Sequence, residues 1–94
     1  MDEVTAIKAT VHGRVQGVFF RASTRKVARE LELSGTVRNL AGWREVEVHA
    51  EGEKAQIEKL IEFLNTGPPG ARVEKVDVEW LEFTGEYNGF NVIY

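Results

Sequence analysis

The chain has no cysteine among its 94 residues, and no uninterrupted apolar run in it exceeds three residues. The lack of cysteine excludes disulfides, thiolate nucleophiles, and the zinc and iron–sulfur sites that need thiolate ligands. The short apolar runs exclude a membrane-spanning helix, which needs about 20 consecutive apolar residues. The first residues, Met1 to Val4, lack the apolar stretch of a signal peptide. We therefore expect a cytoplasmic protein without membrane contact.

The composition is that of an ordinary folded domain. Hydrophobic residues make up 43% of the chain and charged residues 29%, close to the average for soluble domains. A chain of this length buries about 65% of the surface that its unfolded form exposes, which is enough for one core. We expect a single domain over residues 1–94, and a monomer.

Charge is distributed unevenly along the chain. The net charge is −3, which argues against a general affinity for nucleic acid or anionic lipid. Residues 4–29 nevertheless contain six basic side chains and no acidic one. Arg21, Arg25 and Arg29 recur every four residues and would form one basic stripe on a helix. This stripe is either a solvated helix face or part of a site for a small anion.

Hydrophobic periodicity predicts both helices and strands. Alternation indicates strands near residues 5–12, 36–40, 45–51, 76–80 and 90–94, while a spacing of three to four indicates helices at 21–33 and between Gly52 and Gly67. The order βαββαβ with a terminal strand is typical of the α+β class. It predicts a ferredoxin-like split βαβ sandwich, with two helices on one face of a mainly antiparallel sheet of four to five strands.

The segment from Gly13 to Arg21 lies between the first predicted strand and the first helix. Its glycines let backbone N–H groups turn toward one point, and a helix N-terminus adds further free donors. Because helical side chains lean toward the N-terminus, we expect the Arg21 guanidinium to reach back into this cradle, where its fork matches two phosphate oxygens. A plain connecting loop is the alternative. The loop lacks the Gly-Lys-Ser/Thr ending of a nucleoside triphosphate site.

Asn39 gains interest from the predicted topology. The first two strands of a split βαβ unit are parallel, and the third strand between them separates their carboxyl ends by about 10 Å. Asn39 ends the second strand, so it faces the same edge as the loop before Arg21. The two side chains could therefore meet a phosphate and a water. The alternative is an asparagine that only satisfies a turn.

The remaining polar and aromatic residues have simpler interpretations. His12 and His49 alternate onto the polar faces of their strands, which predicts solvated histidines; a phosphohistidine at His12 is the alternative. No group of His, Asp and Glu has metal-ligand spacing. Five aromatic residues are interpreted as packing in the core and at the sheet edges: Trp80, Phe83, Tyr87, Phe90 and Tyr94.

These motifs resemble those of the acylphosphatase family. The segment Gly13-Arg14-Val15-Gln16-Gly17-Val18-Phe19-Phe20-Arg21 is similar to the phosphate-loop signature of the family. The segment Gly35-Thr36-Val37-Arg38-Asn39 is similar to its second signature, with Thr36 in place of an aromatic residue. Residues 67–73 and 89–92 also look like the family. The resemblance covers essentially the whole chain.

The resemblance implies hydrolysis of the carboxyl–phosphate anhydride of a small-molecule acyl phosphate. Inorganic phosphate would be the product and an inhibitor, with no metal, phosphoenzyme or cofactor. It implies that Arg21 binds the phosphoryl group and that Asn39 positions the attacking water. The rest of the implied site is the phosphate-binding loop, Val15, Gln16, Gly17, Val18, Phe19 and Phe20.

Two other functions share the predicted fold. RNA-recognition domains have the same element order, but their third strand carries stacking aromatics. The third strand here reads Val-Glu-Val-His-Ala-Glu, without aromatics, so we expect no nucleic-acid partner. A module that binds phosphate or acyl phosphate without catalysis is the second alternative. Such a module would have the same fold and the same phosphate-binding loop as the enzyme.

Overall fold

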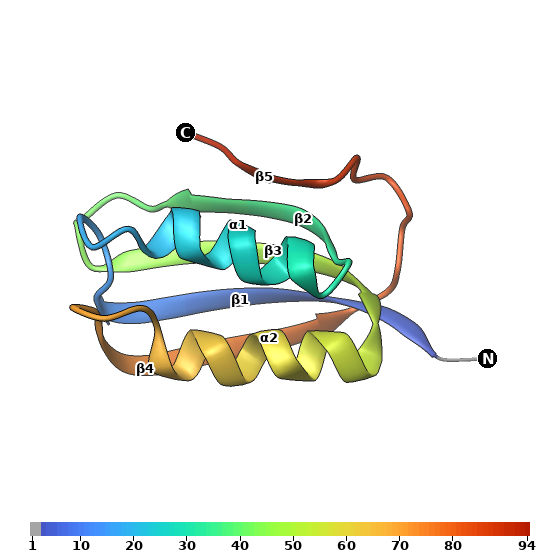
Figure 1. Cartoon of the computed structure of the whole chain (residues 1–94), viewed down its shortest axis with the longest axis horizontal. Helices are drawn as coiled ribbons and strands as arrows, with labels where there is room; N and C mark the ends of the chain where they lie inside the picture. The colour runs from blue at the N-terminus through green and yellow to red at the C-terminus, as the bar shows by residue number, and fades with distance from the viewer. Residues whose placement is uncertain (1–2) are drawn as a thin grey trace.

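Two helices cover one face of a five-stranded sheet in the computed structural model, which describes residues 3–94 (Figure 1). The elements in chain order are β1 (Val4–Arg14), α1 (Phe20–Glu30), β2 (Ser34–Asn39), β3 (Glu45–Glu53), α2 (Lys54–Thr66), β4 (Arg72–Leu81) and β5 (Phe90–Val92). The predicted fold class and every predicted element are confirmed. Within the described residues, no helix is both long enough and apolar enough to cross a bilayer.

The strand order is β4-β1-β3-β2-β5. Strand β3 pairs antiparallel with both β1 and β2, so these two strands are parallel to each other with β3 between them. Strand β5 pairs parallel with β2 and extends the sheet at that edge. The carboxyl ends of β1 and β2 therefore lie at the same end of the sheet, together with the start of α1 (left in Figure 1).

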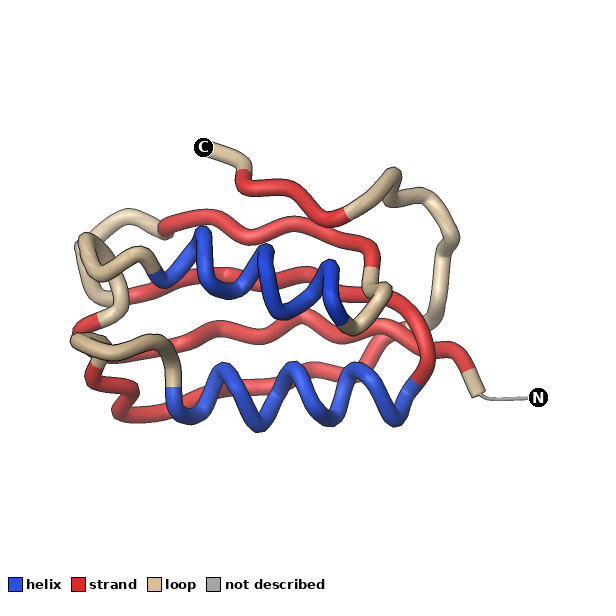
Figure 2. The backbone as a smooth tube through the Cα atoms, viewed as in Figure 1, coloured by secondary structure: helices blue, strands red, loops and turns tan. Residues whose placement is uncertain are grey.

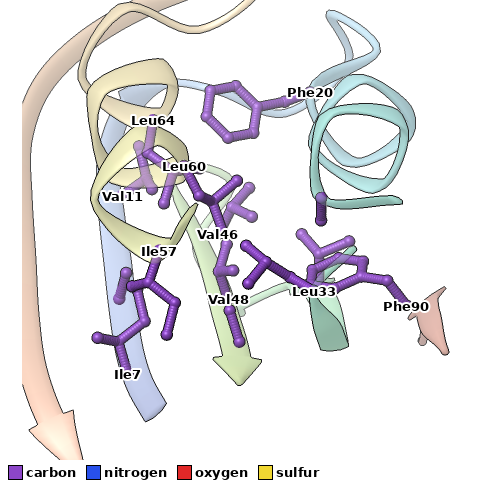
Figure 3. Close-up of a cluster of buried hydrophobic side chains, with 14 of the residues drawn as sticks. Ile7, Val11, Phe20, Leu33, Val46, Val48, Ile57, Leu60, Leu64 and Phe90 are labelled. Atoms are coloured by element: carbon purple, nitrogen blue, oxygen red, sulfur yellow. The ribbon is translucent and has the colours of Figure 1, made fainter. Parts of the chain in front are cut away.

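The core lies between the sheet and the helix layer that Figure 2 shows in front of it. Alternate residues of β1 and β3 face the helices and are fully buried, because one face of the sheet is covered and the other is open. Figure 3 shows side chains of α2 meeting those of β1 and β3, with Phe20 from α1 and Phe90 from β5 closing the opposite side. The largest buried hydrophobic side chains are Phe20, Phe90, Ile7, Ile57, Leu60 and Leu64.

One glycine determines where β1 leaves the sheet. The register between β1 and β4 shifts between His12 and Gly13, and Gly13 has φ 136°. A Cβ at Gly13 would overlap the backbone carbonyl oxygen of Arg72, so only glycine lets the two strands approach this closely. Beyond this irregularity the chain turns out of the sheet and forms the loop that leads to α1.

The interpretation of the aromatic residues as packing in the core and at the sheet edges is confirmed for Phe90 in the core and fits Trp80 on the edge strand, but it is wrong for Tyr94. Phe90 is 1% exposed, whereas Trp80 and Phe83 are each 46% exposed and Tyr94 is 96% exposed. Trp80 lies opposite Ile7 on the edge strand β4, where its ring contacts the ammonium of Lys54 instead of the core. Alternation predicts on which face of the sheet a side chain lies, but it does not predict how much of that face the helices cover.

Candidate active site

The loop between β1 and α1 has the backbone pattern of an anion-binding nest. Gly17 has φ 74° and Phe19 has φ 60°, and they alternate with residues of negative φ. Such alternation turns successive N–H groups toward the same side of the chain. Phe19 is also the N-cap of α1, whose free N–H groups and dipole add positive potential. In the described part of the chain, no backbone amide of residues 15–19 donates a hydrogen bond to the protein.

This loop borders a hollow of about 350 Å³, called here the Arg21 hollow. The predicted site residues that line it are Val15, Gly17, Phe19, Phe20, Arg21 and Asn39. The other lining residues are Ala22, Arg25, Val92 and Tyr94. Of the predicted residues, Gln16 and Val18 do not line the hollow. The structure therefore brings the two predicted catalytic residues, from α1 and β2, to one concave surface.

The basic stripe of α1 runs from this hollow toward β5. Arg29 donates a hydrogen bond from Nε to the carbonyl oxygen of Phe90 at 3.0 Å, so it holds the strand edge. Arg21 and Arg25 line the hollow, and within residues 3–94 neither forms an ion pair with a carboxylate. The guanidinium carbon of Arg21 instead lies 4.9 Å from the centroid of the Tyr94 ring. Both charges therefore remain available to an anion.

Asn39 presents an unpartnered acceptor at the end of β2. Its backbone pairs with Val46, and its side-chain Oδ1 is buried without a hydrogen-bond partner in the described residues. A buried acceptor left without a donor costs about 1–3 kcal/mol, so a water or a ligand donor is favoured there. The side chain forms no hydrogen bond with the β2–β3 turn, which argues against the interpretation of Asn39 as a turn asparagine.

Comparisons with known proteins fit this geometry. A sequence profile of the acylphosphatase family matches residues 7–92. The chain belongs to the acylphosphatase family. An acylphosphatase of Roseiflexus sp. (strain RS-1) is 51% identical over 94 residues, which cover 100% of each chain. The solved structure of an acylphosphatase from Coxiella burnetii is 47% identical, with a TM-score of 0.90 over 96% of this chain and 93% of that one. An acylphosphatase from Bacillus subtilis, 30% identical, also gives 0.90, over 96% and 99%.

Membership of the acylphosphatase family confirms the predicted family and the predicted enzyme class, a hydrolase acting on acid anhydrides. Sequence reasoning missed four lining residues of the hollow. Arg25 had a signal, since it belongs to the basic stripe, and Val92 lies in a segment that resembles the family, but Ala22 and Tyr94 had none. Val92 and Tyr94 reach the hollow because β5 pairs with β2 in parallel. That pairing depends on the whole fold and leaves no local pattern.

The two histidines lie on the open face of the sheet, outside the Arg21 hollow. Both ring nitrogens of His12 lie 2.9 Å from carboxylate oxygens, of Glu45 and Asp77, so His12 is paired on both sides. His49 lies 3.3 Å from Glu47. Alternation predicted solvated histidines without partners, whereas both histidines contact carboxylates in the structure. Within the described residues, no cluster of three or more His, Asp or Glu side chains could hold a metal ion.

Glu47 has the one carboxyl group in this network with a clearly shifted pKa. Its side chain is only 13% exposed, and Arg38 Nε donates a hydrogen bond to its Oε1 at 2.9 Å. Burial alone would raise the pKa of Glu47, but Arg38 and His49 more than offset burial and hold the pKa below its ordinary value. This pair joins β2 to β3 on the open face and so supports the strand that carries Asn39.

Proposed function

We propose that Arg21 and the backbone amides of residues 15–20 bind the phosphoryl group of an acyl phosphate, and that Asn39 positions the attacking water. The observation that carries the proposal is the Arg21 hollow. One concave surface combines unpaired guanidinium groups, a loop of free amides and the asparagine at the end of β2. These groups match the charge of a phosphoryl group and the polarity of a water.

The chemistry needs only positioning and charge stabilisation. The oxygen of water attacks phosphorus, the bond from phosphorus to the acyl oxygen breaks, and the carboxylate leaves with the bonding electrons. A proton of the water passes to the phosphate formed or to solvent. Because a carboxylic acid has a pKa near about 4, the leaving group needs no general acid. Phosphoryl transfer through a loose transition state places most of the demand on orientation and on stabilising the equatorial oxygens.

Each proposed residue has one role. Arg21 would hold two phosphoryl oxygens with its planar fork, and the loop amides would hold the third oxygen as negative charge develops. Asn39 would hold the water through its side-chain amide, which offers both a donor and an acceptor. Arg25 adds a second positive charge to the hollow. Its lining contains no acidic side chain, so it offers no carboxylate ligand to Mg²⁺.

Turnover of benzoyl phosphate by the purified protein tests the proposal. We expect hydrolysis to benzoate and phosphate, competitive inhibition by inorganic phosphate, and no hydrolysis of an alkyl phosphate such as glycerol phosphate. The alkyl ester is a matched control, because its alkoxide leaving group would need an acid or a metal. Binding of phosphate without turnover of benzoyl phosphate would instead identify a non-catalytic phosphate-binding module.

A further inference from the structure

We infer that Gln16 is a positioning residue: its side-chain amide ties the phosphate loop to the β2–β3 turn and thereby fixes the place of Asn39. The inference rests on the role proposed for Asn39. Gln16 does not line the Arg21 hollow; its side chain contacts the β2–β3 turn instead. Two hydrogen bonds from Gln16 and one within the turn define this contact.

The Gln16 amide nitrogen joins both sides of the turn. Nε2 donates to the carbonyl oxygens of Leu40 and Glu45, each at 2.9 Å. Leu40 and Glu45 themselves close the turn, because the Leu40 N–H donates to the Glu45 carbonyl at 3.0 Å. The two hydrogens of one amide nitrogen thus serve two carbonyls at the base of the turn. Since carbonyls cannot donate, the amide orientation is defined: Nε2, not Oε1, must face the turn.

The turn is held by hydrogen bonds and not by packing on the core. Gly42 and Trp43 have positive φ values of 99° and 72°, and the Trp43 side chain is 82% exposed, so the tip of the turn does not pack on the core. The β2–β3 ladder ends at the pair Asn39 and Val46. Two further bonds hold Arg44: its carbonyl accepts from the Gly13 N–H at 3.0 Å, and its Nη2 donates to Glu74 Oε2 of β4 at 2.7 Å. The bonds of Gln16 are the ones that tie the phosphate loop to the base of the turn beside Asn39.

This arrangement couples the two halves of the proposed site. The peptide plane that follows Asn39 is held by the Leu40 N–H bond to the Glu45 carbonyl, the same carbonyl that accepts a hydrogen bond from Gln16. Gln16 directly precedes Gly17, which lines the Arg21 hollow. One side chain therefore sets the distance between the amides that would bind phosphate and the amide that would hold water. Catalysis by positioning is sensitive to such a distance, since an error of 1 Å can cost about 100-fold in rate.

Substitution of Gln16 by methionine tests the inference, because methionine has a similar length and no donor. With benzoyl phosphate as substrate, we expect kcat to fall by about 10-fold or more, while the inhibition constant of inorganic phosphate changes by less than about 2-fold. Gln16→Glu has the same shape but sets a carboxylate against two carbonyls, so we expect a larger fall in kcat. Asn65→Leu is the matched control: it removes another amide-to-carbonyl bond, from Asn65 to Ile61 at 2.9 Å, at a residue that does not line the Arg21 hollow. We expect no change in kcat from it.

A double-mutant comparison separates positioning from general stabilisation. If Gln16 acts through Asn39, Gln16→Met should lower kcat by less than about 2-fold in an Asn39→Ala background. A loss of the same size in both backgrounds would overturn the inference. So would a parallel loss of phosphate affinity and kcat in Gln16→Met, which would place Gln16 among the phosphate-binding groups.

A readout without turnover keeps the inference independent of the proposed function. In ¹⁵N NMR spectra of the unliganded protein, Gln16→Met should shift the Asn39 side-chain amide signals and speed hydrogen exchange at the Leu40 amide, while the signals of α2 stay in place. Unchanged Asn39 and Leu40 signals in a folded Gln16→Met variant would overturn the inference. If Gln16→Met does not fold, the same spectra of Gln16→Glu test the inference in its place. Failure of the wild-type protein to hydrolyse benzoyl phosphate, with these spectral changes present, would count against the proposed function alone.

Discussion

The guanidinium carbon of Arg21 lies 4.9 Å from the centroid of the Tyr94 ring, which joins the first turn of α1 to a residue near the end of β5. The aromatic face attracts the cation without neutralising it, whereas a carboxylate in the same place would compete with a phosphate. This contact explains how Arg21 is oriented toward the hollow although no acidic side chain in the described chain holds it. The exposed position of Tyr94 limits the strength of the contact.

Removal of the Tyr94 ring should therefore weaken phosphate binding modestly. A cation–π contact at an exposed site contributes about 0.5–1 kcal/mol, so Tyr94→Leu should raise the inhibition constant of phosphate about 2- to 5-fold. Tyr94→Phe keeps the ring and should bind phosphate like the wild type. Inhibition of benzoyl phosphate hydrolysis by inorganic phosphate measures this constant for both variants. Equal weakening by both substitutions would assign the effect to the hydroxyl and not to the ring.

Arg21→Lys should lower kcat/KM by at least about 100-fold, because lysine keeps the charge but loses the planar fork that holds two oxygens. Thermal unfolding should change little, since the Arg21 side chain makes no ion pair within residues 3–94. Arg29→Lys is the matched control on the same stripe, outside the hollow, and should keep its activity within about 2-fold. If Arg21→Lys retains most of the activity, Arg21 belongs to a solvated helix face.

The sequence was informative wherever a local pattern reflects the fold directly. Alternation at Ile7 and Val48 identified the buried faces of β1 and β3, and both side chains are at most 1% exposed. The order of the elements then placed Arg21 and Asn39 at the same end of the sheet, and both line one hollow. These predictions depend on backbone periodicity and on topology, which short stretches of sequence determine.

Contacts between distant segments could not be predicted in this way. The exposure of Trp80 depends on how far α2 covers the edge strand, which follows from helix packing and not from the pattern of β4. The contact of Tyr94 with Arg21 depends on the parallel pairing of β5 with β2. The direction of the Gln16 side chain depends on the turn that follows β2. To predict any of these three features, one must know where a second, distant segment of the chain lies in space.

Removal of metal ions should leave the rate of benzoyl phosphate hydrolysis unchanged. Arg21, Arg25 and the loop amides supply the positive charge that a metal would otherwise provide, and the hollow has no acidic side chain as a ligand. Prolonged dialysis against a chelator followed by a rate measurement checks this. A loss of activity that Mg²⁺ restores would contradict the proposed site.

The ion pair between Glu47 and Arg38 should make stability depend on pH. The pKa of Glu47 is held below its ordinary value of 4.5 in the folded protein, so its contribution is present above that value and is lost as the pH falls through the folded-state pKa. Because Arg38 is 46% exposed, we expect Glu47→Gln to lower the free energy of unfolding by only about 0.5 kcal/mol at pH 7. Urea unfolding of both proteins from pH 7 to pH 3 measures the difference, which should shrink toward zero at the acidic end. A difference that keeps the same size at acidic pH would assign the effect to packing.

Asn39→Ala should separate binding from chemistry. Arg21 and the loop amides would still hold the phosphoryl group, so the affinity for inorganic phosphate should change by less than a few-fold. The rate should fall by about 10²- to 10³-fold, or roughly 3–4 kcal/mol, the effect of removing one preorganised polar group. Calorimetric titration with phosphate, set beside benzoyl phosphate turnover, measures the two quantities separately.

Asn39→Asp is the control that distinguishes an acceptor from an amide. Aspartate keeps an acceptor oxygen at the position of Oδ1, the buried atom that lacks a partner, but it adds negative charge beside the bound phosphate and loses the amide donor. We therefore expect it to leave the rate as low as in the alanine variant and to weaken phosphate binding more than alanine does. If the alanine variant loses phosphate binding, Asn39 holds the ligand and not the water. Unchanged turnover in the alanine variant would leave Asn39 as an end residue of β2 without a part in the reaction.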